Sequence, residues 1–188
     1  MPDARTALLV MDVQHGVVER LGDRAVLDAT GRAVEAARAD DVAVMFVRVA
    51  FRPGFPEVGE QNATFAALAN GGGEAMTQDH PATQVHGAVE PRPDEPVVTK
   101  RRVSAFSGSD LEVLLRARRI DSLVLAGIAT SGVVLSTLRQ AADLDYRLTV
   151  LADACADRDP EVHRVLTEKV FPRQALVTTT DEWIQTLA

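Results

Sequence analysis

The sequence predicts an α/β fold: a three-layer domain built on a six-stranded, mostly parallel sheet with helices on both faces. Short runs of apolar and β-branched residues recur along the chain, and the longer segments between them carry apolar residues at helical spacing. Strands that alternate with helices in this way pair in parallel through right-handed crossovers. With 188 residues, 46% of them hydrophobic, the chain can bury a substantial core. We therefore expect a single domain over residues 1–188.

The expected strands are short apolar runs, each bounded by polar or turn residues. They cover residues 6–11, 42–49, 97–100, 122–126, 147–151 and 175–178.

Four segments between the strands have the spacing of amphipathic helices. They cover residues 23–39, 109–118, 131–143 and 160–170. Ser109 and Asp159 have side chains suited to cap two of these helices, and Pro160 suits a first helical position. No internal repeat or low-complexity tract interrupts this order.

The stretch from residue 50 to residue 96 breaks the alternation. It holds six of the nine prolines, and we expect one short helix there, over residues 63–69. Loops of this length in compact domains are usually functional or disordered. We interpret the stretch as a cover over the strand ends that contributes to a subunit interface. The alternative is a surface excursion without a role.

Charge and composition exclude several classes of protein. The formal net charge is -7 and basic residues are mostly scattered, whereas a nucleic-acid surface needs clustered Lys and Arg. The first apolar run, residues 7–11, is far shorter than the roughly 20 residues of a membrane span. The single cysteine, Cys155, excludes an intramolecular disulfide framework, and no secretion signal is evident. We expect a cytoplasmic protein that binds neither nucleic acid nor membrane.

Two opposite charges stand where predicted strands end. Asp12 follows the first strand, and Lys100 ends the third. Ligands of open α/β sheets bind at the carboxyl ends of the strands, so the two residues form a useful pair if their strands are neighbours. Burial raises the pKa of such an Asp and a nearby cation lowers it, so Asp12 can serve as acid or base and Lys100 can orient it. The alternatives are an Asp that caps a turn and a solvated Lys.

The fourth strand runs directly into a helix through small residues, and the turn carries no obvious nucleophile. N–H groups at a helix N-terminus are free and lie at the positive end of the helix dipole. The backbone from Ala129 to Val133 is therefore a candidate site for an oxyanion or a carboxylate.

Other residue types carry weaker signals. Phe106 either lines a pocket or belongs to the core, and the core is the commoner place for a lone aromatic residue. Cys155 has acidic neighbours, which raise the pKa of a thiol and favour a structural cysteine over a nucleophile. The four histidines lack metal-ligand spacing, so we expect no metal.

Three separated motifs, in this order, resemble the isochorismatase-like hydrolase family, whose members are often called cysteine hydrolases. They are Asp12 after the first strand, Lys100 after the third, and residues 127–130 before the helix. Residues 104–106 and 153–154, the latter after the fifth strand, add to the match, which covers nearly the whole chain. The resemblance implies a parallel six-stranded, Rossmann-like α/β sheet, in agreement with the strand pattern.

The resemblance also implies roles for the charged residues. Amidases of the family use an Asp, a Lys and a Cys whose sulfur attacks a carbonyl. Asp12 and Lys100 match the first two, and Val133 stands in the position of the Cys. Valine has no nucleophilic atom, so thiol catalysis is excluded there. Family members that act on isochorismate also lack the Cys and protonate a vinyl ether with the Asp before water adds. By this resemblance Asp12 is a general acid and Lys100 its partner.

Further features follow from the same resemblance. The residues expected to bind an oxyanion or the substrate are Ala129, Val133, Gln14, Phe106 and Thr130. The family often has a cis peptide between the residues that match Ile128 and Ala129. The metal ligands of its nicotinamidase branch have no counterpart in residues 48–51, so we expect neither metal nor cofactor. Family members commonly form homodimers or homotetramers, and we expect the same here.

We therefore expect a metal-free hydrolase that acts on a small molecule by acid–base chemistry through Asp12. One alternative is a catalytically silent binding or regulatory protein that keeps the family pocket without its nucleophile. Another is that Ser131 replaces the thiol, which requires its hydroxyl to lie near Asp12.

Overall fold

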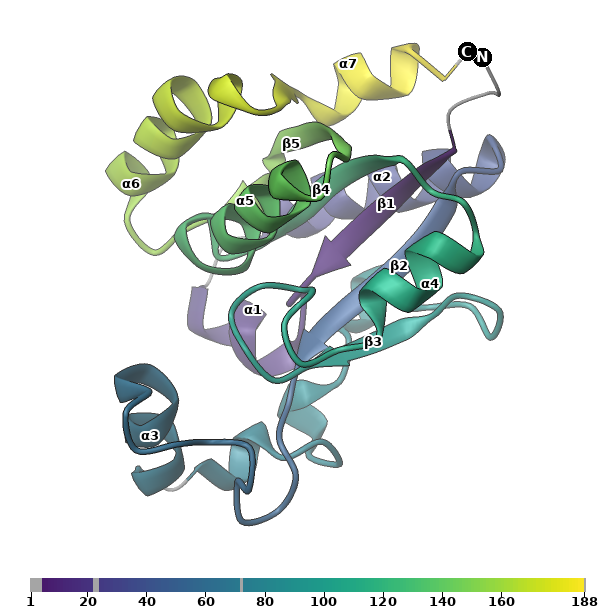
Figure 1. The fold of residues 1–188 in the computed structure, drawn as a ribbon. Coiled ribbons are helices and arrows are strands. Elements are labelled where there is room, and N and C mark those ends of the chain that lie inside the picture. The colour runs from purple at the N-terminus through teal and green to yellow at the C-terminus, as the bar shows by residue number, and fades with distance from the viewer. Residues whose placement is uncertain (1–4, 22–23, 72, 188) are drawn as a thin grey trace.

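The strands of the computed structural model, which describes residues 5–21, 24–71 and 73–187, form one six-stranded sheet. They are β1 (Thr6–Met11), β2 (Ala43–Val49), β3 (Val97–Lys100), β4 (Ser122–Ile128), β5 (Arg147–Ala156) and β6 (Leu176–Thr178). The order is β3-β2-β1-β4-β5-β6 and neighbouring strands are parallel (Figure 1). The predicted fold class is confirmed. In doubly wound sheets of this order, ligands bind where the strand order reverses, here beyond the ends of β1 and β4.

Most strand bounds match the expectation, and β5 is the main exception. It continues to Ala156, five residues beyond the predicted end at Leu151, and after a register shift it pairs with the end of β4. Residues 153–155 therefore lie within the strand, not after it. The strand accommodates the polar Asp153 because its carboxylate accepts hydrogen bonds from the amide and hydroxyl of Thr180, at 2.7 and 2.9 Å.

The helices follow the predicted alternation. They are α1 (His15–Leu21), α2 (Ala25–Ala39), α3 (Ala63–Asn70), α4 (Leu111–Ala117), α5 (Leu135–Asp143), α6 (Pro160–Val165) and α7 (Thr180–Gln185). Short 3-10 or π-helical turns cover Gly73–Met76, Pro81–Thr83, Gly87–Val89, Thr130–Val134, Leu166–Val170 and Phe171–Arg173. Of the first predicted helix, Asp23 lies outside the described residues.

Two short helices, α1 and α7, were not predicted. The α7 helix begins with a capping box between Thr179 and Glu182, a signal that the sequence contains. The predicted cap at Asp159 is confirmed, because its carboxylate accepts from two amides of the first turn of α6. The predicted cap at Ser109 is wrong by one residue: Asp110 holds that position, and the Ser109 hydroxyl accepts from Leu111 N at 3.3 Å.

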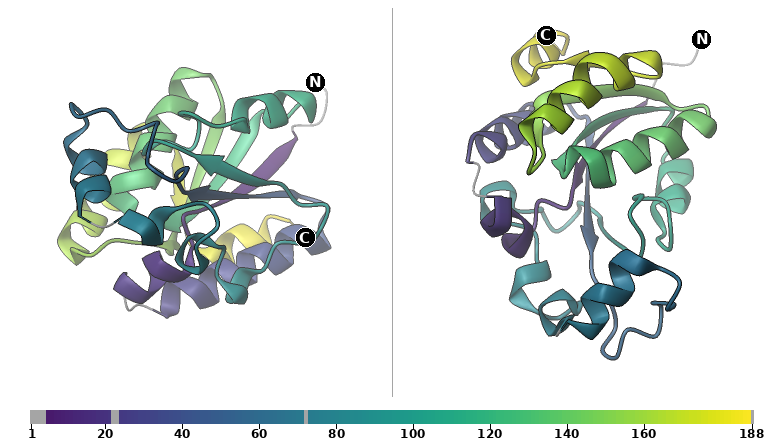
Figure 2. Two further views of the ribbon diagram at one scale, coloured as in Figure 1. Left: turned by 90° about the horizontal axis from the view of Figure 1, so that it is seen from below. Right: turned by 90° about the vertical axis from the view of Figure 1, so that its left-hand side faces the viewer.

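Alternate residues of the central strands face two separate apolar cores. On β1, Leu9 and Met11 pack with residues of α4 and α5, whereas Leu8 and Val10 pack with α2. Figure 2 (right) shows α1 and α2 on one side of the sheet and α4 and α5 on the other. The predicted three-layer arrangement follows from this alternation. Within the described ranges, no helix is both long and apolar enough to cross a membrane.

The first part of the stretch 50–96, which we call the cover segment, lies beyond the carboxyl ends of β1, β2 and β3, as predicted (Figure 1). Its last part does not, because residues 87–96 return beside α2, where Glu90 and Glu95 accept hydrogen bonds from Arg38. The cover segment contains α3, which confirms the helix predicted over residues 63–69. It also has a small apolar cluster of its own around Phe51 and Phe65. Its contribution to a subunit interface stays a prediction.

Close contact between β1 and β4 requires a glycine at Gly127. This residue has φ 157°, and a Cβ atom there would lie 2.3 Å from the Met11 carbonyl oxygen. A backbone oxygen cannot move aside as the end of a side chain can. The glycine therefore lets the two strands that flank the switch point meet.

We expect Gly127→Ala to lower the free energy of unfolding by about 1–3 kcal/mol, the usual cost of overpacking. Gly87→Ala is the matched control, because nothing lies within 4 Å of its added Cβ. Urea unfolding of both variants measures the difference. Equal midpoints for the two would contradict the close-contact argument.

Candidate active site

The ends of β1 and β3 bring two opposite charges into contact. Lys100 Nζ lies 2.9 Å from Asp12 Oδ2, and the two residues are 1% and 6% exposed. The sequence left open that the two strands are neighbours. In the structure they are not, because β2 lies between them. The long lysine side chain reaches across the end of β2. Asp12 adopts a left-handed φ of 55°, which Asp tolerates better than most residues.

Burial dominates the protonation of Asp12. Loss of water raises the pKa of its carboxyl, and the charge and hydrogen bond of Lys100 lower it without cancelling the effect. Lys100 Nζ has a second acceptor, the carbonyl of Arg102 at 3.0 Å. Asp12 Oδ1, by contrast, is buried without a hydrogen-bond partner. The pair thus presents a buried carboxyl that can hold a proton.

Gln14 fastens the site to the cover segment. Its side-chain nitrogen donates to the carbonyls of Val49 at 3.0 Å and Thr83 at 2.7 Å, and its oxygen accepts from Val49 N at 2.9 Å. Both amide protons are therefore used within the protein. Gln14 positions backbone around Asp12, and its predicted contact with a substrate stays a prediction.

The turn after β4 has the backbone that the family resemblance implies. A cis peptide joins Ile128 to Ala129, and the π-helical turn Thr130–Val134 leads into α5. The amides of Gly132 and Val134 both donate to the Ala129 carbonyl, at 3.1 and 3.3 Å.

A carboxylate of the protein itself binds at this helix N-terminus. Ser131 N donates to Asp157 Oδ2 at 2.7 Å. Burial opposes ionisation of Asp157, but hydrogen bonds from Ser131 and neighbouring amides outweigh it and lower its pKa. The side chain of Thr130 is also engaged, 2.8 Å from His163 Nδ1. The predicted anion site at Ala129 and Val133 is untested, although the turn does bind a carboxylate.

Val133 and Phe106 belong to one apolar core. Val133 is 2% exposed and lies in the same cluster as Phe106 and Met11. The Phe106 ring is 6.0 Å from that of Tyr146. Because β4 pairs with β1, with Gly127 opposite Met11, the turn that carries Val133 begins beside Asp12.

Neither of two possible nucleophiles is supported at this site by the structure. Cys155 is buried within β5, and burial, with a smaller contribution from Asp153, raises the pKa of its thiol to about 12. Burial is thus the main cause, whereas the sequence suggested acidic neighbours. Ser131 is exposed, and its hydroxyl makes no hydrogen bond to Asp12. The Ser131 alternative therefore lacks support.

A cluster of arginines that the sequence did not single out holds the cover segment beside Lys100. Arg101 donates to the Ala50 carbonyl and lies 3.4 Å from Glu57 Oε1, and Arg102 Nη2 donates to the Glu57 carbonyl at 2.8 Å. Glu57 Oε2 is buried without a partner. In the sequence, residues 100–102 are the one exception to the scattered placement of basic residues.

Metal chemistry receives no support from side-chain geometry. Within the described part of the chain, no three His, Cys, Asp or Glu side chains are grouped to hold a metal ion.

Comparisons with known proteins agree with the fold and with the family that the sequence resembles. The family model for the Isochorismatase domain matches residues 6–182. The isochorismatase family protein YwoC of Bacillus subtilis is 33% identical over 96% of this chain and 93% of its own length. The ureidoacrylate amidohydrolase RutB of Stutzerimonas stutzeri is 34% identical over 86% of this chain and 73% of its own.

Solved structures of similar proteins share the fold over nearly the whole chain. A cysteine hydrolase from Pseudomonas syringae superimposes with a TM-score of 0.87 at 26% identity, covering 97% of this chain and 92% of that one. The N-carbamoylsarcosine amidase from Thermoplasma acidophilum has a TM-score of 0.74 at 26% identity, covering 94% and 97%.

We expect the Asp12 carboxyl to titrate above its ordinary pKa, and Lys100→Met to raise that pKa further, because it removes the charge and hydrogen bond that lower it. The neutral carboxyl then becomes the favoured form in the core. Carbon-13 NMR titration of the Asp12 carboxyl measures both midpoints. Lys169→Met, at an exposed position, is the control and should leave the midpoint unchanged. A downward shift in Lys100→Met would contradict the assignment.

We expect Glu57→Gln to speed proteolysis within the cover segment at least several-fold, because Arg52 and Arg101 lose their anionic partner. Glu60→Gln, at an exposed position, is the matched control. Burial opposes ionisation of Glu57, but hydrogen bonds from its own backbone and from Arg52, with the charge of Arg101, lower its pKa. The contacts of the ionised Glu57 carboxylate with the arginines are therefore present at neutral pH and are lost as pH falls through that lowered pKa. Equal cleavage rates in the two variants would show that the Glu57 carboxylate does not hold the cover segment in place.

Proposed function

The chain belongs to the isochorismatase family, and we propose that it is a hydrolase that acts on a small molecule by acid–base chemistry at Asp12, without a thiol nucleophile. The buried Asp12–Lys100 pair carries this proposal. Its carboxyl has a raised pKa and a buried oxygen without a partner, at the switch point of a doubly wound sheet.

The proposed reaction consumes one water. Protonated Asp12 donates its proton to the substrate, for example to the terminal carbon of a vinyl ether, which leaves a cationic carbon bonded to oxygen. Water adds to that carbon and gives a proton to the Asp12 carboxylate, so the acid is regenerated. The adduct then separates into a carbonyl compound and an alcohol. Lys100 stabilises the carboxylate that exists between the two proton transfers.

The absence of a suitable thiol supports this choice over covalent catalysis. Val133 stands in the position that the family resemblance assigns to the nucleophile, and it is a buried apolar residue. The Cys155 thiol, with its pKa raised to about 12, is protonated at neutral pH.

The second candidate is a catalytically silent binding or regulatory protein. The valine at position 133 favours it, because two of the similar proteins are named as an amidohydrolase and an amidase, and amidases of this family use a thiol. Breakdown of a bound ligand separates the two functions. The single-domain organisation, cytoplasmic location and homodimer or homotetramer stay predictions from composition and resemblance.

We expect Asp12→Asn to lower turnover by at least about 100-fold, the usual contribution of a general acid, while ligand binding changes little. The assay screens vinyl ethers, amides and imides for turnover by the unaltered protein and then compares variants. Asp41→Asn is the matched control, because Asp41 also has a left-handed φ, of 53°, and is exposed.

Two results would count against the enzyme. Undiminished turnover in Asp12→Asn would remove Asp12 from the chemistry. Saturable binding of a screened compound without any breakdown would support the silent protein instead.

A further inference from the structure

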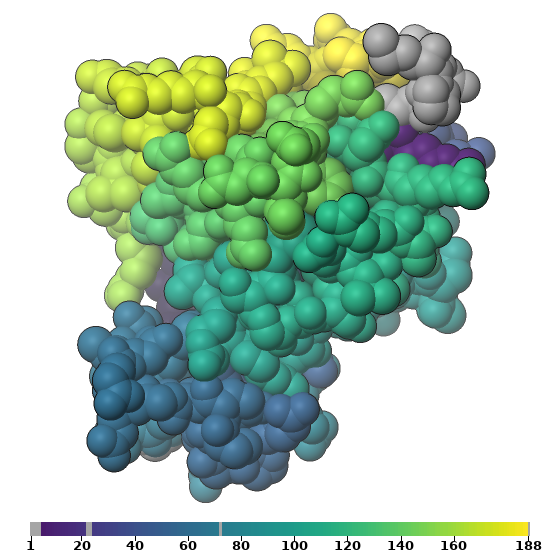
Figure 3. Space-filling model, viewed as in Figure 1, coloured from purple at the N-terminus to yellow at the C-terminus, as the bar shows by residue number. Residues whose placement is uncertain are grey.

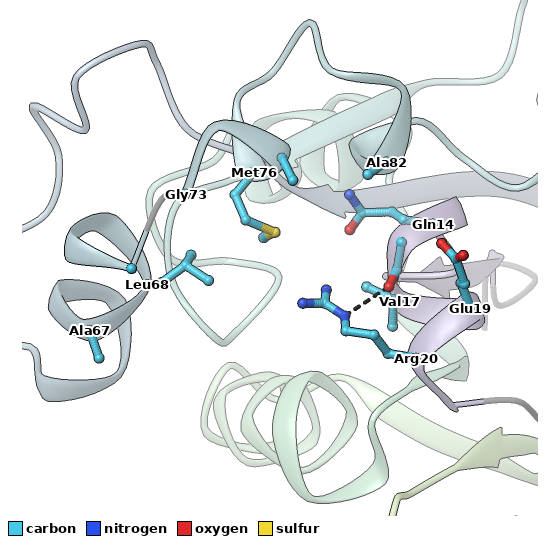
Figure 4. A pocket seen from close by; sticks show the side chains of 12 residues that line it. Gln14, Val17, Glu19, Arg20, Ala67, Leu68, Gly73, Met76 and Ala82 are labelled. Carbon is cyan, nitrogen blue, oxygen red and sulfur yellow. Dashed lines mark hydrogen bonds between the residues drawn. The ribbon is translucent and has the colours of Figure 1, made fainter.

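A cavity of about 460 Å³ lies between α1 and the cover segment (Figure 4). This volume falls within the range of about 300–1,000 Å³ that is common for small-molecule sites. In Figure 3 the surface is hollowed at its left edge, between the blue α3 segment and the rest of the molecule. Neither Asp12 nor Lys100 is among the lining residues, so the cavity is distinct from the charged pair.

The cavity walls are mostly apolar. Val17 comes from α1, Leu68 from α3 and Met76 from the 3-10 turn that follows, and small residues such as Ala82 complete the lining. Gln14 also borders the space. Because Gln14 lies just after Asp12 in the chain, the cavity is at the same end of the sheet as the candidate active site.

The exposed side chain of Arg20 borders this apolar space. In Figure 4 the Arg20 guanidinium lies between Leu68 and Gln14. Its Nε donates to the Gly16 carbonyl at 2.8 Å, which fixes the base of the side chain. Among the described residues, none accepts a hydrogen bond from its two terminal nitrogens or forms an ion pair with it. Glu19, the other charged lining residue, is not within ion-pair distance of Arg20.

We propose that this cavity binds a small carboxylate with an apolar body, and that Arg20 selects the carboxylate. A guanidinium presents parallel N–H donors that match the two oxygens of a carboxylate, and the apolar walls accommodate the rest of the ligand. Arg20 repels an ammonium ligand, and it stabilises a neutral ligand less than a carboxylate because the neutral contact lacks the ionic contribution. The proposal extends beyond the proposed reaction, because it does not require Asp12 to transfer a proton.

The test compares benzoate with benzamide, which has nearly the same shape but no charge. Isothermal titration calorimetry of the full chain measures both affinities, and NMR shifts of the Val17 and Leu68 amides locate the ligand. We expect benzoate to bind about tenfold more tightly than benzamide, the ratio that a charge-assisted hydrogen bond gives. Arg20→Gln should remove this difference. Arg116→Gln should keep it, because Arg116 is an exposed helix arginine whose Nε also contacts residue i−4.

Two further variants separate the contributions to binding. Leu68→Ala should weaken both ligands by a similar factor, because it removes apolar wall and not charge. Asp12→Asn should leave benzoate binding unchanged, so a failure of the proposed reaction does not affect this result. Equal affinities for the two ligands, no saturable binding of benzoate, or no effect of Arg20→Gln would each overturn the proposal.

Discussion

The buried ion pair between Asp12 and Lys100 is the interaction on which the candidate site depends. Removing two charges from water costs free energy unless close geometry and further hydrogen bonds offset it. Lys100 has such support from the Arg102 carbonyl, whereas one oxygen of Asp12 has no partner. Apolar side chains would fill this space at lower cost. An incompletely paired carboxyl at the switch point of the sheet is therefore better explained by function than by stability.

The same two strand ends that position the pair also hold the cover segment. Directly after Lys100, Arg101 and Arg102 contact Ala50 and Glu57. Just after Asp12, the Gln14 side chain bonds backbone from the cover segment and from β2. Movement of the cover segment would therefore change the surroundings of the Asp12–Lys100 pair. The cavity bordered by Arg20 lies where the cover segment meets α1.

The turn after β4 completes the arrangement by close packing instead of reactive groups. Gly127 allows β4 to approach Met11. The chain then enters a helical turn in which Val133 is buried and the Ser131 amide donates to Asp157. A nucleophile could have stood at this turn, as it does in amidases of the family by resemblance. With valine there, the polar chemistry of the site rests on the carboxyl of Asp12.

Local sequence patterns were enough to predict the alternation of strands and helices, the strand ends that carry Asp12 and Lys100, and the turn at Gly127. These features are local, because apolar periodicity and turn residues act over a few positions. The three-dimensional packing added that β2 separates the charged strands, that β5 continues past Asp153, that Glu57 contacts the arginines after Lys100, and that Arg20 borders a cavity. Those outcomes depend on partners far apart in the chain, such as Thr180 for Asp153, and no local pattern encodes such contacts.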